Sequence, residues 1–177
     1  MSFRAGEGAG EENALSRNLH GLERGAKEPS SCELLIVGAG LAGAAALEAA
    51  RSLGLEATVF DSRSDRGSPR PVSVREGRLV VAEDGYSREV RARSVVLATG
   101  ATKGRKPQLA IAKALGCRSF YDRTLRYECL ALDAEGRTSI PGVFAAGDAA
   151  RVGSESDAIE SGRRAGEAAV AHLRESA

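Results

Sequence analysis

The sequence predicts an α/β protein with a Rossmann-like parallel sheet, helices on both faces of that sheet and a small antiparallel β-meander. An apolar run at residues 33–37 (ELLIV) predicts a buried strand, and the glycine-rich turn at 38–43 (GAGLAG) follows it directly. The Ala- and Leu-rich stretch 44–53 predicts a helix, and the apolar run 57–60 predicts a second strand. Strand, helix and strand within about 30 residues form a β-α-β crossover, which implies parallel strands.

Further elements are expected along the rest of the chain. Residues 72–93 carry turn signals at 76–77 (EG) and 84–85 (DG) between alternating residues, which predicts the meander. The run 94–97 (SVVL) predicts another buried strand. A short helix over 107–115, a strand over 143–146 and a final helix over 155–173 complete the prediction.

Composition limits the classes of function. The 177 residues, 42% of them hydrophobic, are enough for one domain with its own core. A net charge of +1 and an aromatic content of 4% without tryptophan argue against nucleic-acid binding. There is no apolar run long enough for a membrane span. Three cysteines without a CxxC pair and two histidines predict neither a disulfide framework nor a metal site.

The chain divides into two regions. Residues 1–30 are polar and glycine-rich, which predicts a disordered or loosely ordered tail, although Leu15, Leu19 and Leu22 have the spacing of a short amphipathic helix. Residues 31–177 are expected to form a single domain. The tail lacks the apolar core of a secretory signal, so a cytoplasmic location is expected.

The glycine-rich turn has the spacing of a dinucleotide-binding motif. Gly38 permits the tight turn, Gly40 lets the backbone approach a pyrophosphate, and Gly43 lets the helix pack closely on the sheet. The amides of the first helical turn, which includes Leu41 and Ala42, would face the phosphates. Asp61, followed by Ser62, lies where a carboxylate accepts hydrogen bonds from a ribose 2′-hydroxyl, which disfavours NADP. The alternative is a glycine-rich strand–helix turn in some other kind of α/β domain. From these residues alone, NAD and FAD both remain open.

Three motifs in order resemble the FAD-binding domain of the two-dinucleotide-binding-domain flavoproteins, the thioredoxin reductase and pyridine nucleotide-disulphide oxidoreductase superfamily. They are GAGLAG with its acid, SVVLATGA at 94–101 and TSIPGVFAAGDAA at 138–150. The resemblance implies FAD as cofactor, with Ala98, Thr99, Gly100 and Gly147 beside it and Asp148 on its ribityl chain. It also directs the N-terminus of the last helix, at Asp157 and Ala158, toward the flavin ring. Residues 114–148 are also similar to the flavin subunits of hydroxyproline dehydrogenase and hydrogen cyanide synthase.

The sequence departs from this family in two ways. Between Gly100 and Gly147 there are too few residues for the family's inserted NAD(P)H domain. The loop after Asp61 lacks the redox cysteine pair, so disulfide reduction is not expected. The leading hypothesis is a single-domain, FAD-dependent oxidoreductase-like flavoprotein, reduced by diffusing NAD(P)H or by a partner subunit. A homodimer or partner is expected to cover the exposed cofactor, and no side chain is assigned as acid, base or nucleophile. A non-catalytic FAD-binding module or degenerate subunit and an NAD-binding Rossmann domain are the alternatives.

Overall fold

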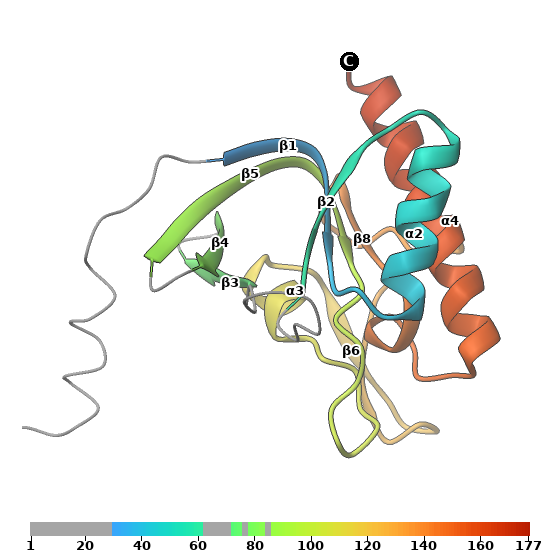
Figure 1. The fold of residues 1–177 in the computed structure, drawn as a ribbon. Helices are drawn as coiled ribbons and strands as arrows, with labels where there is room; N and C mark the ends of the chain where they lie inside the picture. Colours follow the sequence, from blue (N-terminus) through green and yellow to red (C-terminus); the bar gives the residue numbers. More distant parts are fainter. Residues whose placement is uncertain (1–29, 62–71, 76–77, 84–85) are drawn as a thin grey trace, which may run out of the picture.

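The computed structural model describes residues 30–61, 72–75, 78–83 and 86–177 (Figure 1). Their elements, in chain order, are β1 (Ser30–Val37), α2 (Leu41–Ser52), β2 (Ala57–Phe60), β3 (Val72–Arg75), β4 (Arg78–Glu83), β5 (Tyr86–Leu97), α3 (Ala110–Ala114), β6 (Ser119–Asp122), β7 (Tyr127–Leu130), β8 (Val143–Ala145), the 3-10 helix η2 (Gly147–Ala149) and α4 (Glu155–Glu175). The predicted tail up to residue 29, Ser62 and the turns at 76–77 and 84–85 lie outside the described residues.

The main sheet is mixed, and its parallel part carries the predicted β-α-β unit. Its strand order is β2-β1-β5-β4-β3, and β8 also pairs with β5. Strands β2, β1, β5 and β8 run parallel, with Leu35 opposite Thr58 on one side and Val95 on the other. Strands β3, β4 and β5 pair antiparallel as a meander. The predicted fold class is therefore confirmed.

Strand β5 joins the meander to the parallel sheet. Its first residues pair with β4, and its last three pair with β8. The sequence predicts the meander and the strand 94–97 as separate elements, whereas the structure has one continuous strand of 12 residues. No glycine, proline, asparagine or aspartate interrupts YSREVRARSVVL, so nothing local ends the strand.

Helices α2 and α4 lie side by side against one face of the sheet (Figure 1). They approach closely because small residues face each other. A Cβ added to Gly162 of α4 would meet the backbone oxygen of Ala42, and one added to Gly166 would lie 2.6 Å from the backbone oxygen of Ala46. The core on this face also contains Ile36, which is fully buried.

The opposite face is covered by α3 and by residues near the β6–β7 hairpin. The core there includes Leu35, Leu97, Ala112 and Leu130. Helix α3 is shorter than the predicted helix at 107–115. The β6–β7 hairpin was not predicted because its turn has no glycine dipeptide. Instead, Asp122 Oδ1 accepts the amides of Thr124 (2.8 Å) and Leu125 (2.9 Å).

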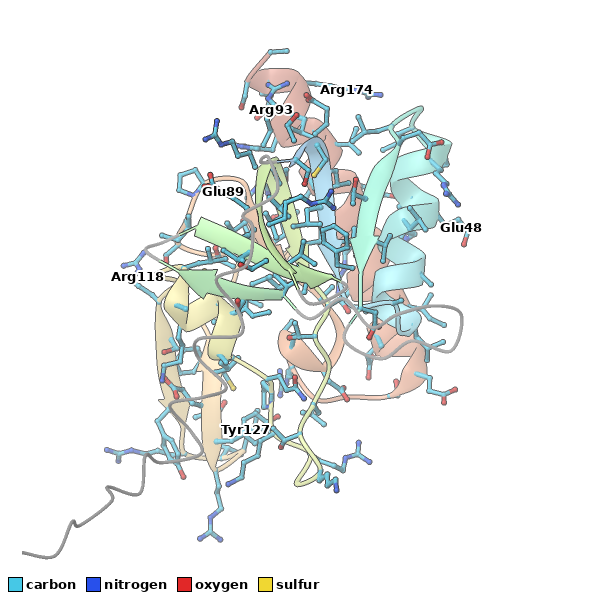
Figure 2. All side chains as sticks on the ribbon, turned by 60° about the vertical axis from the view of Figure 1, so that its left-hand side comes forward. Glu48, Glu89, Arg93, Arg118, Tyr127 and Arg174 are labelled. Carbon is cyan, nitrogen blue, oxygen red and sulfur yellow. The ribbon has the colours of Figure 1, made fainter. Side chains whose placement is uncertain are left out.

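Two arginines hold the C-terminal end of α4, at the opposite end of that helix from Ala158 (Figure 2). Arg93 donates to Glu33 Oε2 at 2.6 Å and to the carbonyl oxygen of Ser176 at 3.0 Å. Arg174 donates to the carbonyl oxygen of Leu53 at 2.7 Å. These cations complement the negative end of the helix dipole and connect α4 to β1 and α2. Among the described ranges, no helix combines the length and apolar character needed to cross a membrane.

Candidate functional site

A cavity of about 780 Å³ lies at the carboxyl ends of the four parallel strands. This volume lies within the usual range of about 300–1,000 Å³ for small-molecule sites. Ligands of open α/β sheets bind at this edge, because the loops that follow the strands meet there. The cavity is lined by ten of the predicted site residues: Gly38, Gly40, Leu41, Ala42, Asp61, Ala98, Thr99, Gly100, Asp148 and Ala158. The fold therefore brings the three sequence motifs to one pocket.

Two predicted glycines shape the pocket without lining it. A Cβ on Gly43 would meet the carbonyl oxygen of Gly38, so only glycine lets α2 start so close to the turn. Gly147 has a φ of +61°, and a Cβ there would lie 2.7 Å from the Cβ of Ala42. Its amide donates to Ser161 Oγ at 2.9 Å. Gly43 and Gly147 therefore set the backbone conformation of the segments that carry the lining residues.

The turn after β1 leaves free amides at the N-terminus of α2. Gly38 adopts a φ of +110°, and its amide donates to the carbonyl oxygen of Phe60 at 2.8 Å. Helix α2 begins after Gly40 with no side-chain cap and no acid in its first turn. The first-turn amides of Leu41, Ala42 and Gly43 have no intrahelical partner by the geometry of a helix start. The uncompensated positive end of the helix therefore faces the pocket, where it favours an anion.

Asp61 is fixed at the end of β2 by the neighbouring turn. Its Oδ2 accepts the amide of Ala39 at 2.6 Å. This bond links the acid to the glycine-rich turn and orients the carboxylate toward the same pocket. A hydrogen bond from a ribose hydroxyl to Asp61 stays a prediction.

Asp148 lies on the other side of the pocket, in the 3-10 helix that follows β8. It is partly buried, and its Oδ1 accepts the amide of Gly153 at 3.2 Å. This bond holds the loop that leads into α4. The second carboxylate oxygen has no protein donor among the described residues. Asp148 can therefore accept a further hydrogen bond from a ligand.

Asp157, a predicted cofactor contact, does not line the pocket. It forms a capping box at the start of α4: the Asp157 amide donates to Ser154 Oγ (3.2 Å) and the Ser154 amide donates to Asp157 Oδ2 (2.9 Å). With Glu155 it places two acids in the first helical turn, which offset the positive end of the helix dipole. The N-terminus of α4 therefore attracts an anion less than that of α2. A cofactor contact of Asp157 itself stays a prediction.

The capping box gives a pH dependence with a defined sign. Hydrogen bonds from the Ser154 side chain and backbone lower the pKa of Asp157. A carboxyl whose pKa is lowered by folding stabilises the fold above its unfolded pKa and loses this effect as pH falls through the folded value. We expect Asp157→Asn to be less stable than the unaltered chain at pH 7, and the difference to vanish on acidification. Urea denaturation of both proteins between pH 7 and pH 2 measures this, and a constant difference would contradict it.

The pocket also contains residues that sequence reasoning missed. Thr102, Arg105 and Gln108, from the segment after β5, line it together with Ile111. Among the lining residues that the structure describes, Arg105 is the one cation. The sequence feature that could have predicted these lining residues is the basic stretch TKGRKP, which follows the glycine of the second motif. It was missed because the stretch matches no glycine-rich or acidic motif.

Among the described residues, no cysteine lines this cavity. No group of three or more His, Cys, Asp or Glu residues among them could hold a metal ion. Cys117 and Cys129 are buried free thiols, and Cys32 is partly buried. Burial raises the pKa of Cys32 and of Cys129. The thiols of Cys32 and Cys129 are therefore protonated at neutral pH, which agrees with a role in packing.

Three solved structures with the same fold are described as an oxidoreductase or as reductases. An oxidoreductase from Agrobacterium tumefaciens has a TM-score of 0.62 at 14% identity, with 82% of this chain and 99% of that chain covered. A bacillithiol disulfide reductase from Staphylococcus aureus has a TM-score of 0.57 at 9% identity, with 80% and 99% covered. A ferredoxin-flavin thioredoxin reductase from Clostridium acetobutylicum has a TM-score of 0.54 at 13% identity, with 82% and 98% covered. At these identities the likeness shows the fold alone.

Sequence comparison names the family. No curated protein matches the sequence. The family model described as alanine dehydrogenase/PNT, C-terminal domain, matches residues 17–115, which is more than half of the chain. The protein therefore has the fold of a Rossmann-type dinucleotide-binding domain, and it belongs to the alanine dehydrogenase/PNT C-terminal domain family.

Proposed function

We propose that the pocket binds FAD and that the chain is a single-domain FAD-dependent oxidoreductase-like flavoprotein. One observation carries the proposal: Asp61 and Asp148, from the first and third sequence motifs, line the same pocket with the glycine-rich turn between them. The two acids follow the first and the last of four neighbouring parallel strands, so three inter-strand spacings, about 14 Å, separate them across the sheet. A single ligand that contacts both acids must be elongated, as a dinucleotide is.

The residues present fit such a ligand. A Cβ built on Gly40 has no atom within 4 Å, so the backbone at this turn is open to a ligand. The amides of Leu41, Ala42 and Gly43 would hold the pyrophosphate, and Asp61 would hold the adenosine ribose. Asp148 would accept a hydrogen bond from the ribityl chain.

The flavin half of bound FAD, which is its redox-active part, would then lie over the ends of β5 and β8. The segment from Ala98 to Gly100 and Ala158 of α4 form that part of the pocket. Bound FAD supplies the electron-transfer chemistry, while the protein supplies binding, orientation and local charge. Its reductant would be diffusing NAD(P)H or a partner subunit, and a second copy or that subunit would cover the exposed part of the cofactor.

NAD is the second candidate, because the matching family is named for a dehydrogenase. The two candidates differ at Asp148. The FAD hypothesis requires this carboxylate on the ribityl chain, which NAD does not have. A third possibility is a non-catalytic FAD-binding module. It would bind FAD through the same residues as the enzyme, but a donor would not reduce its flavin.

We expect Asp148→Asn to weaken FAD binding about 10- to 150-fold, because a hydrogen bond to a charged group contributes about 1.5–3 kcal/mol. Asparagine keeps an oxygen that can accept the Gly153 amide, so the loop before α4 should stay in place. Isothermal titration calorimetry of the purified apoprotein with FAD and, separately, with NAD measures the change in affinity.

Glu48→Gln is the matched control, since Glu48 points away from the molecule on α2 (Figure 2) and lines no part of the pocket. FAD affinity that is unchanged in Asp148→Asn, together with tighter binding of NAD than of FAD, would refute the FAD proposal in favour of NAD. If FAD binds, anaerobic addition of NADH or NADPH distinguishes an enzyme, whose flavin absorbance at about 450 nm bleaches, from a module, whose absorbance does not.

A further inference from the structure

Arg105 lines the pocket as a cation without a partner, whereas the other charged residues among the described lining are acids. Its side chain makes no hydrogen bond or ion pair within residues 30–61, 72–75, 78–83 and 86–177. Three carboxylates line the same pocket, namely those of Asp61, Asp148 and Glu155. In contrast, Arg93, Arg137 and Arg163 elsewhere in the molecule are each paired with a carboxylate. The guanidinium of Arg105 is thus available to a ligand.

The backbone around Arg105 is held in one conformation. The Thr102 amide donates to the Lys106 carbonyl oxygen at 2.8 Å, and the Arg105 amide donates to the Thr102 carbonyl oxygen at 2.9 Å. A bridge between Ala101 and Pro107 closes the loop. Arg105 itself has a φ of 53°, a conformation that a residue with a side chain rarely adopts. A left-handed arginine at a pocket persists only because the loop around it imposes that conformation.

The loop also creates a positive rim. Lys103 and Lys106 are exposed on either side of Arg105, and no acid occurs between residues 101 and 109. Neither lysine forms an ion pair with a described residue. Clustered like charges at a cleft raise the local concentration of oppositely charged ligands. The rim therefore favours the approach of an anion.

The phosphates of a dinucleotide already have donors elsewhere. The free amides at the start of α2 follow β1, and Asp61 follows β2, whereas Arg105 follows β5. Under the proposed function, Arg105 therefore lies on the side of the redox-active half of the cofactor. A guanidinium at that place can bind the substrate that exchanges electrons with the cofactor. Among the described lining residues, one guanidinium lies with three carboxylates, and this balance favours a singly charged carboxylate over a doubly charged phosphate.

We propose that Arg105 binds the carboxylate of a small organic acid, the substrate, beside the bound dinucleotide. This inference rests on the proposed function for the place of the cofactor. The planar guanidinium can form two parallel hydrogen bonds to a carboxylate, which fixes the orientation of the substrate as well as its position. Gln108 and Thr102, which line the pocket nearby, add polar groups for the rest of the molecule.

The test uses acetate as the probe and acetamide, its neutral isostere, as the control ligand. Nuclear magnetic resonance of the arginine Nε–H groups follows binding in the full chain saturated with FAD or NAD. The Arg105 signal is identified by its loss in Arg105→Gln. We expect acetate to shift this signal saturably, acetamide to leave it unchanged, and Arg105→Gln to weaken acetate binding roughly tenfold or more.

Arg126→Gln is the matched control variant. Arg126 is also exposed with a positive φ of 59°, but it lies in the β6–β7 turn, outside the pocket. We expect this variant to bind acetate like the unaltered chain, and the Arg126 signal not to move. Arg105→Lys, which keeps the charge but not the planar fork, should bind acetate with intermediate affinity.

Three outcomes would overturn the inference. They are an Arg105 signal that does not respond to acetate, an equal loss of acetate binding in Arg126→Gln, and a dinucleotide affinity that falls tenfold or more in Arg105→Gln alone. The last result would assign the guanidinium to a phosphate of the cofactor. If the unaltered chain binds neither FAD nor NAD, the proposed function fails by itself, and the acetate titration of the free chain still decides whether Arg105 holds a carboxylate.

Discussion

Gly40→Leu is expected to abolish dinucleotide binding while the fold stays intact. The position has an ordinary φ of −72°, and a Cβ there meets nothing within 4 Å, so the folded chain can accept a side chain. That open space is the pocket in front of the free amides of α2. A leucine would occupy the place of the pyrophosphate, and we expect binding at least about 100-fold weaker, which corresponds to about 2.8 kcal/mol.

The control for this prediction is Ala44→Leu, one turn further along α2. Ala44 is exposed and does not line the pocket. Calorimetric titration with FAD and NAD compares the variants, and urea denaturation measures the free energy of unfolding. Replacement of glycine by leucine at the helix N-cap should cost about 1 kcal/mol of stability. Dinucleotide affinity that survives in Gly40→Leu would show that the ligand does not approach this turn.

Gly162→Ala is expected to destabilise the protein by about 2–3 kcal/mol. At an exposed helical site the same change stabilises by about 1 kcal/mol, because alanine is the better helix former. Here the added methyl group would meet the backbone oxygen of Ala42, which cannot move without displacing α2. Ala42 also lines the pocket, so separation of the two helices should weaken dinucleotide binding as well.

Gly104→Ala serves as the matched control. A Cβ on Gly104 would have only Thr102 Oγ1 within 4 Å, at 3.9 Å. We expect this variant to unfold within about 0.5 kcal/mol of the unaltered chain, as surface substitutions usually do. Equal denaturation midpoints for the two variants would show that the α2–α4 contact is looser than the structure indicates.

The sequence alone determined the parallel β-α-β unit. The apolar run before the glycine-rich turn, the Ala-rich helix and the apolar run up to Asp61 each carry their own local signal. The spacing of the glycines likewise predicted the tight turn at Gly38 and the close approach at Gly43, because backbone conformation and the absence of a Cβ are properties of the residue itself. The motifs also predicted ten of the residues that line the pocket.

Only the tertiary structure decided what these motifs form together. That Asp61 and Asp148 share a cavity depends on strand order, since β8 pairs with β5 across a long stretch of sequence. The tertiary structure also shows that β5 is continuous with the meander. It shows that the unpredicted β6–β7 hairpin packs on one face of the sheet, and that Arg105 lines the pocket. It assigned Asp157 to a helix cap, because a Ser154 partner was three residues away. These features result from contacts between distant segments and from side-chain competition for partners, which no local pattern encodes.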